Sequence, residues 1–123
     1  MRVNGYPAQP MSMEESHYLR VAHDTFQKVI GAFDEIDSED ADVDTQGDVI
    51  SIRFRDGTRL ILNTQRPTKQ LWLAGRGRAW HFDFDEASAS WRDDKAREEL
   101  FATLHALSLA SGLAVPSLSE SAT

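Results

Sequence analysis

Two helical patterns at the chain ends enclose a run of short strands, and this order constrains the fold more than any other feature of the sequence. In the first pattern, apolar residues from Leu19 to Phe33 recur at helical spacing. Just before it, Ser12 and Glu15 have the spacing of a capping box, in which Ser12 is the N-cap. We therefore predict a first helix over about 13–36.

The hydrophobic period changes to two after residue 40, which is typical of strands with one buried face. Turn residues separate the alternating stretches, among them the Asp56-Gly57 pair that is typical of a tight hairpin. Because the links are short, neighbouring strands should run antiparallel. The predicted strands are 41–45, 49–54, 59–63, 69–74, 78–84 and a short strand around Trp91.

The second helical pattern follows the last strand. Its apolar spine from Ala96 to Leu107 predicts a helix that begins at Asp93-Asp94, where acidic residues suit the positive helix end, and ends near Gly112. Two amphipathic helices can cover one face of an antiparallel sheet and leave the other face to water.

The predicted fold class is therefore α+β. It is a two-layer sandwich in which the two terminal helices pack side by side on one face of an antiparallel sheet of about six strands. Residues 1–12 are expected to be a disordered lead-in, 13–118 a single domain, and 119–123 a frayed tail.

Composition excludes several classes of protein. The 123 residues include no cysteine, which rules out a disulfide framework, a thiolate metal site and a cysteine nucleophile. No apolar run approaches the ~20 residues of a membrane span, and the N-terminus has no hydrophobic core of a secretory signal. The net charge of −7, without a basic stripe, argues against nucleic acid and anionic membranes as partners.

Acidic charge is concentrated in one segment. Eight of the fifteen residues from Asp34 to Asp48 are acidic, and no Lys or Arg falls between Lys28 and Arg53. This segment carries −8 of a total of −7, so the other residues sum to +1. Like charges this close oppose folding by mutual repulsion, which favours a role in binding a cation or a basic partner. The alternative is a solvated face without a partner.

The spacing within the segment favours weak cation sites. Strand alternation would put Asp40, Asp42 and Asp44 on one face, roughly 7 Å apart. Hard cations take carboxylate oxygens as ligands, but carboxylates that diverge from a strand leave most of the coordination shell to water. An EF-hand loop starting at Asp42 fails because its twelfth position is Arg53. We expect weak, multiple, surface metal sites.

The uncovered face of the sheet is predicted to carry an aromatic residue. Leu71 and Leu73 are natural core positions, so alternation turns Gln70 and Trp72 outward. The same argument turns His81 outward on the next strand, near Trp72. Exposed aromatic surface often marks a contact site. The alternative is that neighbouring side chains half-cover Trp72 and it has no binding role.

Residues 63–74 read Asn-Thr-Gln-Arg-Pro-Thr-Lys-Gln-Leu-Trp-Leu-Ala. This stretch resembles the N-x-Q-x-P-x-x-Q-x-W-L stretch of the frataxin family, bacterial CyaY type. The acidic segment, the strand Trp80-His81-Phe82-Asp83 and Trp91 are also similar to that family, so the resemblance covers about 13–112. Two features depart from it: Arg76-Gly77-Arg78 replaces a frequent Gly-Gly, and one residue is missing between Glu39 and Asp40. The first should put a basic loop near the partner face.

The resemblance implies an α-β sandwich and a role in iron–sulfur cluster assembly. It implies a cytoplasmic, non-enzymatic regulator that binds ferrous or ferric iron weakly, docks on the cysteine desulfurase and the scaffold protein, and is monomeric unless metal drives oligomers. Carried over residue by residue, it implies an acidic metal-binding ridge and a partner-binding surface. The acidic ridge is Glu14, Glu15, Asp34, Glu35, Asp37, Glu39, Asp40, Asp42 and Asp44. The partner-binding surface includes Asn63, Gln70, Trp72 and His81.

An enzymatic alternative is a ferroxidase or iron-storage activity through oligomers. Glu14 and His17 have the Glu-x-x-His spacing of ferroxidase centres in helical bundles. One copy at an exposed helix start would not enclose two metals, so the regulatory function is preferred. A third hypothesis is an acidic adaptor that never meets metal.

Overall fold

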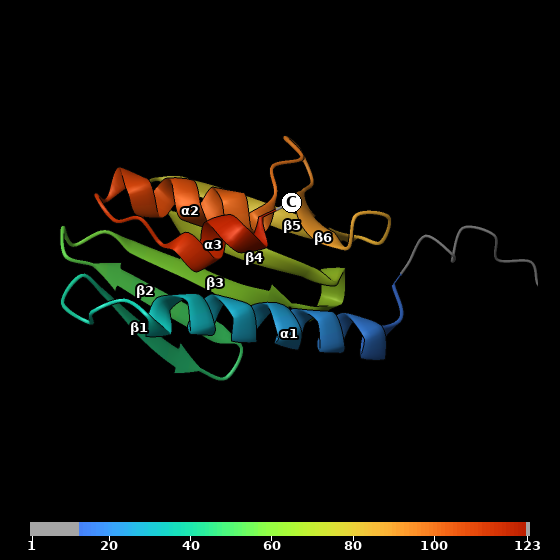
Figure 1. Cartoon of the computed structure of the whole chain (residues 1–123). Coiled ribbons are helices and arrows are strands. Elements are labelled where there is room, and N and C mark those ends of the chain that lie inside the picture. Colours follow the sequence, from blue (N-terminus) through green and yellow to red (C-terminus); the bar gives the residue numbers. More distant parts are fainter. Residues whose placement is uncertain (1–12, 123) are drawn as a thin grey trace, which may run out of the picture.

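The computed structural model describes residues 13–122 and has the predicted architecture of an antiparallel sheet covered by helices (Figure 1). The strands follow the chain in the order β1-β2-β3-β4-β5-β6, so each strand pairs with its neighbour in sequence. The elements are α1 (Glu15–Asp34), β1 (Ala41–Gln46), β2 (Val49–Phe54), β3 (Arg59–Gln65), the short 3-10 helix η3 (Arg66–Thr68), β4 (Gln70–Gly75), β5 (Arg78–Asp85), β6 (Ser90–Asp93), α2 (Leu100–Ala110) and α3 (Pro116–Ser121).

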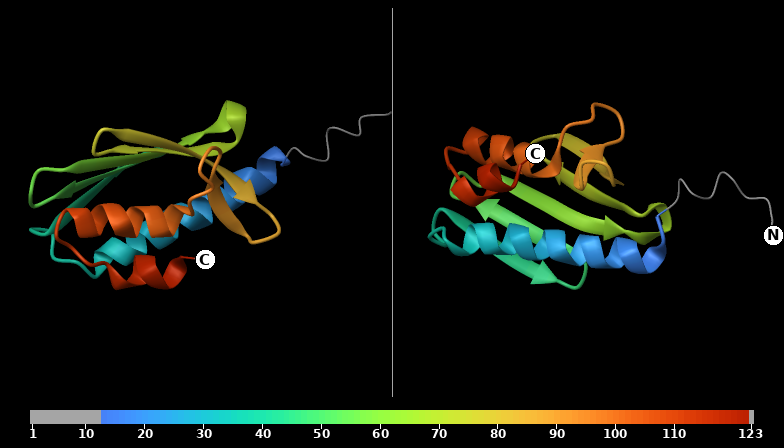
Figure 2. Two further views of the ribbon diagram at one scale, coloured as in Figure 1. Left: turned by 90° about the horizontal axis from the view of Figure 1, so that it is seen from above. Right: turned by 45° about the vertical axis from the view of Figure 1, so that its right-hand side comes forward.

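The molecule has two layers. All three α-helices of the described chain lie on one side of the sheet, and the other side is left open (Figure 2). α3 lies beside both α1 and α2 in these views, so the C-terminal segment completes the helical layer. The α+β two-layer sandwich is therefore confirmed, with a third short helix added.

The core lies between the layers and is built from the predicted inward positions. Leu71 and Leu73 of β4 are fully buried, as the alternation requires. The buried Trp91 indole of β6 donates a hydrogen bond to the Thr25 hydroxyl on α1 at 2.8 Å. The Tyr18 hydroxyl donates to the Gln70 carbonyl at 2.8 Å, which ties the start of α1 to β4. Polar groups in the core are thus paired across the two layers.

The start of the second helix was predicted wrongly. α2 begins at Leu100, and Asp93, the predicted start, instead ends β6. Asp93 is buried and its carboxylate accepts hydrogen bonds from the backbone N–H groups of Lys95, Ala96 and His81, at 3.1, 2.8 and 3.1 Å. This capping pattern resembles a helix start, but the chain turns again at Arg97, whose φ is 62°.

Glu99 is the true N-cap of α2. Its carboxylate accepts from the backbone N–H groups of Phe101 and Ala102, at 3.0 and 2.9 Å. The predicted end near Gly112 is confirmed, because Gly112 follows the C-cap with the positive φ of 84° that such a position favours.

The chain ends also differ from the prediction. α1 is shorter at both ends than 13–36, and its N-cap is Glu14, without a side-chain capping bond. The predicted N-cap Ser12 and the lead-in 1–12 lie outside the described residues. At the other terminus, α3 runs to Ser121, within the segment expected to fray, because Val115 and Leu118 are fully buried. No helix among the described residues is long and apolar enough to cross a membrane.

Candidate functional site

A polar and aromatic row crosses the open face of the sheet. Asn63 on β3 is opposite Trp72 on β4, which is opposite His81 on β5. The Trp72 and His81 rings are stacked, with centroids 4.3 Å apart and planes inclined by 20°. Each of the three side chains is half-buried. The structure thus brings together three of the four residues predicted for the partner-binding surface, and the cross-strand proximity of Trp72 and His81 is as predicted.

Gln70, the fourth residue, holds the indole in place. Its side-chain carbonyl accepts a hydrogen bond from Trp72 Nε1 at 2.9 Å. Its amide nitrogen donates to Asp83 Oδ1 at 3.0 Å and to Asp94 Oδ2 at 3.3 Å. Because these bonds fix the amide, they also fix the indole ring that depends on it. The aromatic group is therefore held in one orientation on the open face, and a group fixed in this way would lose less entropy on binding.

Seven acidic residues collect where α1 passes into β1, and we call them the 34–44 cluster. Asp34 ends α1, Glu35 is its C-cap, and Asp42 and Asp44 lie in β1. Carboxylates near a helix C-terminus are opposed by the helix dipole, so stability does not explain them. The cluster comprises Asp34, Glu35, Asp37, Glu39, Asp40, Asp42 and Asp44.

Two arginines of β2 and its turn reach this cluster, which sequence reasoning missed. Arg55 pairs with Asp40 at 2.7 Å, and Arg53 lies 3.9 Å from Asp42. The sequence contains no base within the acidic segment, but antiparallel pairing places Arg53 opposite Asp42. The register of the β1–β2 hairpin could have revealed this contact. Both pairs are exposed, where an ion pair contributes little to stability.

Other members of the cluster keep their charge free of such partners. Within the described residues, the carboxylates of Asp34, Glu39 and Asp44 make no hydrogen bond or ion pair. Glu35 accepts a hydrogen bond from the Ser117 hydroxyl at 3.0 Å, and Asp37 accepts one from the Glu39 backbone N–H at 2.9 Å. The cluster is therefore still strongly negative after its two arginine contacts are counted.

The summed negative charge of the 34–44 cluster could attract hard cations, but its carboxylates do not enclose a coordination site among the described residues. In the part of the chain that the structure describes, no three His, Asp or Glu side chains converge on one point that could hold a metal ion. Asp42 and Asp44 point from β1 onto the open face, while Asp34 and Glu35 belong to the helical layer. Carboxylate oxygens suit iron as a hard cation, but an ion here would keep mostly water ligands.

Glu14 and Glu15 do not lie with the rest of the predicted ridge. They are at the opposite end of α1, and a 20-residue helix is about 30 Å long. The Glu15 carboxylate pairs with Arg66, and this hydrogen bond lowers the pKa of Glu15. Glu14 accepts a hydrogen bond from the Ser16 hydroxyl at 2.6 Å. These two residues thus form a separate, smaller acidic site.

His17, which the ferroxidase alternative pairs with Glu14, contacts other residues. Its Nε2 lies 3.0 Å from a carboxylate oxygen of Glu86, in the loop after β5, and its Nδ1 lies 2.9 Å from the Arg20 guanidinium. The Phe84 ring packs edge-on against the imidazole, with centroids 6.1 Å apart. Among the described residues, no hydrogen bond or ion pair joins His17 to Glu14.

The basic loop between β4 and β5 is held by the protein itself. Arg76 donates to the hydroxyls of Thr58 and Ser111, at 3.1 and 3.3 Å. Arg78 lies over the Trp80 ring, 4.6 Å from its centroid. Both arginines are therefore engaged with other parts of the protein, whereas the basic loop was expected near the partner face.

Comparisons with known proteins agree with this architecture. Residues 11–110 match the family model described as a frataxin-like domain. The iron–sulfur cluster assembly protein CyaY of Pseudomonas aeruginosa is 40% identical over 100 residues, which are 81% of this chain and 92% of that protein. The protein of the same name from Azotobacter vinelandii is 39% identical over 90 residues, 73% of this chain and 81% of that protein.

A solved structure is similar as well. Frataxin from Psychromonas ingrahamii aligns with a TM-score of 0.74 and 30% sequence identity, and the match covers 84% of this chain and 96% of that one. The family match includes α1, the whole sheet and α2. The chain therefore belongs to the frataxin family, and within it to the bacterial CyaY type.

Proposed function

We propose that this protein is an iron-binding regulator of iron–sulfur cluster assembly. It binds ferrous or ferric iron weakly on the 34–44 cluster and docks on a complex of the cysteine desulfurase and the scaffold protein. The names of its bacterial relatives, which are iron–sulfur cluster assembly proteins, support this role. As part of this proposal, the protein acts in the cytoplasm and is a regulator that is not itself an enzyme.

One observation carries the docking part of the proposal. Asp42 and Asp44 of β1 project onto the same open face as Trp72 of β4, because each occupies the outward parity of its strand. A single partner can therefore contact Asp42 and Asp44, which we call the acidic edge, and Trp72 at the same time. The acidic edge attracts a basic surface over long range, and the oriented indole supplies the close contact.

The same geometry supports the proposal that iron is bound weakly. Several carboxylates are close enough to attract the same ion, but among the described residues they do not converge on one position. An ion would therefore have few protein ligands. Such sites exchange iron readily, which suits a regulator that senses or transfers iron. A storage site would need an enclosed set of ligands.

The test is a binding measurement on the purified desulfurase–scaffold complex with three variants. Trp72→Ala should weaken binding by about 2 kcal/mol, as expected for the loss of an aromatic anchor. Asp42→Asn with Asp44→Asn should lower the association rate more than it raises the dissociation rate. The control, Asp24→Asn, removes one exposed charge from α1, away from the open face, and should leave both rates nearly unchanged. Unchanged binding in the first two variants would refute docking through this face.

A further inference from the structure

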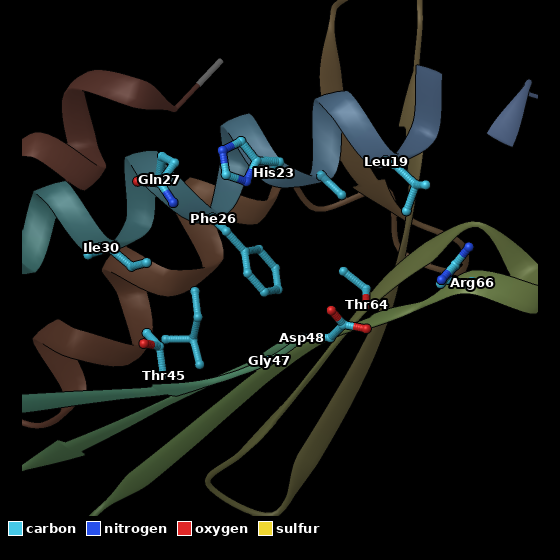
Figure 3. A pocket seen from close by; sticks show the side chains of 12 residues that line it. Leu19, His23, Phe26, Gln27, Ile30, Thr45, Gly47, Asp48, Thr64 and Arg66 are labelled. Atoms are coloured by element: carbon cyan, nitrogen blue, oxygen red, sulfur yellow. The ribbon is translucent and has the colours of Figure 1, made fainter. Parts of the chain in front are cut away.

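A groove between α1 and the β1–β2 end of the sheet is left unfilled by the chain. Its volume is about 330 Å³, at the lower end of the range for small-molecule pockets. It lies on the covered side of the sheet, away from Trp72, so the proposed docking surface does not use it (Figure 3).

The groove exists because the helical layer does not cover the C-terminal end of β1. The inward positions of β1 run from Ala41, which is buried, through Val43, which is half-buried, to Thr45, which is exposed. On the opposite wall, Leu19 belongs to the apolar spine of α1, yet 39% of it is exposed. Both side chains face space that a core would normally fill, so an apolar group placed there would remove them from water.

The floor of the groove is apolar and aromatic. Phe26 projects from α1 towards the strands (Figure 3), and the buried Ile50 of β2 also lines the groove. A flat ring or a short chain could lie against these side chains. Apolar floors with a few polar groups at the mouth are typical of ligand sites.

The mouth of the groove carries a carboxylate, on Asp48. Asp48 is the last member of the acidic segment, and it lies in the β1–β2 turn, away from the 34–44 cluster. Its backbone carbonyl accepts a hydrogen bond from the Thr64 N–H at 3.2 Å. Within the described residues, its carboxylate makes no hydrogen bond or ion pair.

The base at the same mouth is already neutralised. Arg66 lines the groove, but its guanidinium is paired with Glu15. His23, the other basic side chain of the lining, is exposed on α1. An anion would have to compete with Glu15 for Arg66 while facing Asp48.

We propose that this groove binds a small organic cation, with an ammonium or amidinium group on Asp48 and an apolar body against Phe26 and Leu19. The site requires neither iron nor the desulfurase. Its ligand class follows from the charge of the mouth and from the apolar floor.

The test uses three small aromatic probes: 2-phenylethylamine and 2-phenylethanol, which differ only in their polar group, and the anion phenylacetate. Each is titrated into the full chain, and backbone amide shifts are followed by NMR. We expect saturable shifts within 19–30, 45–50 and 64–66, with the ammonium probe about tenfold tighter than the alcohol because it adds a charge-assisted hydrogen bond. Phenylacetate should bind more weakly than either.

Two variants and one control locate the contacts. Asp48→Asn should abolish the preference for the amine over the alcohol, whereas Asp24→Asn, an equal charge change outside the groove, should keep it. Thr45→Phe should fill the groove and weaken both probes. Equal affinity for amine and alcohol, shifts scattered outside the groove, or an unchanged preference in Asp48→Asn would overturn the proposal. So would groove shifts that change on dilution of the protein alone, because a second copy would then be the occupant.

Discussion

The Trp72 indole is stacked on the His81 imidazole from the neighbouring strand, with ring centroids 4.3 Å apart. The indole N–H is bonded to Gln70, which is itself bonded to Asp83 and Asp94. An aromatic group on an open sheet face is thereby fixed from two sides. Because Trp72 lies outside the core, we expect it to act mainly through contacts with a partner.

Trp72→Ala should cost little stability. The side chain is half-buried on the open face, so its removal leaves no enclosed cavity, and we expect a loss of about 1 kcal/mol or less in the free energy of unfolding. Leu73→Ala is the matched control, because Leu73 is 1% exposed and should lose about 2–5 kcal/mol through a core cavity. Urea denaturation measures both. Equal losses would mean that Trp72 has a structural role.

Repulsion within the 34–44 cluster should lower the stability of the fold, and the carboxylates without an arginine partner should contribute most to it. Replacing the unpaired Asp34, Glu39 and Asp44 with their amides should raise the melting temperature, because it relieves repulsion without breaking an ion pair. Replacing Asp40 and Asp42 should raise it less, because Arg55 and Arg53 lose their partners. Calorimetry compares the two variants. A lower melting temperature in the first would contradict the account.

Asp93 should couple stability to acid pH. Burial raises the pKa of its carboxyl, but the hydrogen bonds from Ala96, Lys95 and His81 outweigh burial and leave the pKa below its usual value. Because the pKa of Asp93 is lower in the folded state than in the unfolded state, the ionised carboxylate stabilises the fold at pH values above the unfolded-state pKa of about 3.9. This stabilisation is lost as the pH falls through the folded-state pKa.

The Asp93→Asn variant tests this coupling. It should be less stable by about 1–3 kcal/mol at pH 7, because one carboxylate oxygen accepts from His81 and the other from Lys95 and Ala96, whereas an amide has only one oxygen that can accept. The difference from the parent should shrink below pH ~4. Denaturant unfolding from pH 2 to 7 measures it, and a gap that is constant over this range would exclude the charged carboxylate as its source.

Association with the desulfurase–scaffold complex should depend steeply on salt. The Debye length shrinks from about 30 Å at 0.01 M to about 8 Å at 0.15 M, so the steering field of the acidic edge is screened. Stopped-flow association rates should therefore fall across this range. An association rate that does not change would show that the acidic edge does not steer the encounter.

Alternation and turn chemistry were sufficient to predict the sheet. Strand order, the inward leucines of β4 and the neighbouring positions of Trp72 and His81 follow from a period of two and short links. The start of α2 did not follow, because Asp93 and Glu99 both cap backbone N–H groups and only tertiary packing decides which one begins a helix.

Spatial relationships between residues in different elements could not be predicted from the sequence either. The pairing of Arg53 with Asp42 needs the hairpin register, and the separation of Glu14 and Glu15 from the 34–44 cluster needs the length of α1. Leu19 fits a helical spine by spacing, yet it is exposed because the end of β1 gives it no partner. Periodicity identifies faces, but it does not say how completely each face is covered.

The most direct test of the central claim is an anaerobic titration with ferrous iron, followed by backbone NMR. If the 34–44 cluster binds iron, paramagnetic broadening should appear first within 34–44 and should decrease in the triple amide variant of Asp34, Glu39 and Asp44. Residues 14–17, about 30 Å away along α1, should broaden later if at all. Broadening that begins at 14–17 and 86, or that is scattered over the surface, would contradict iron binding at this cluster.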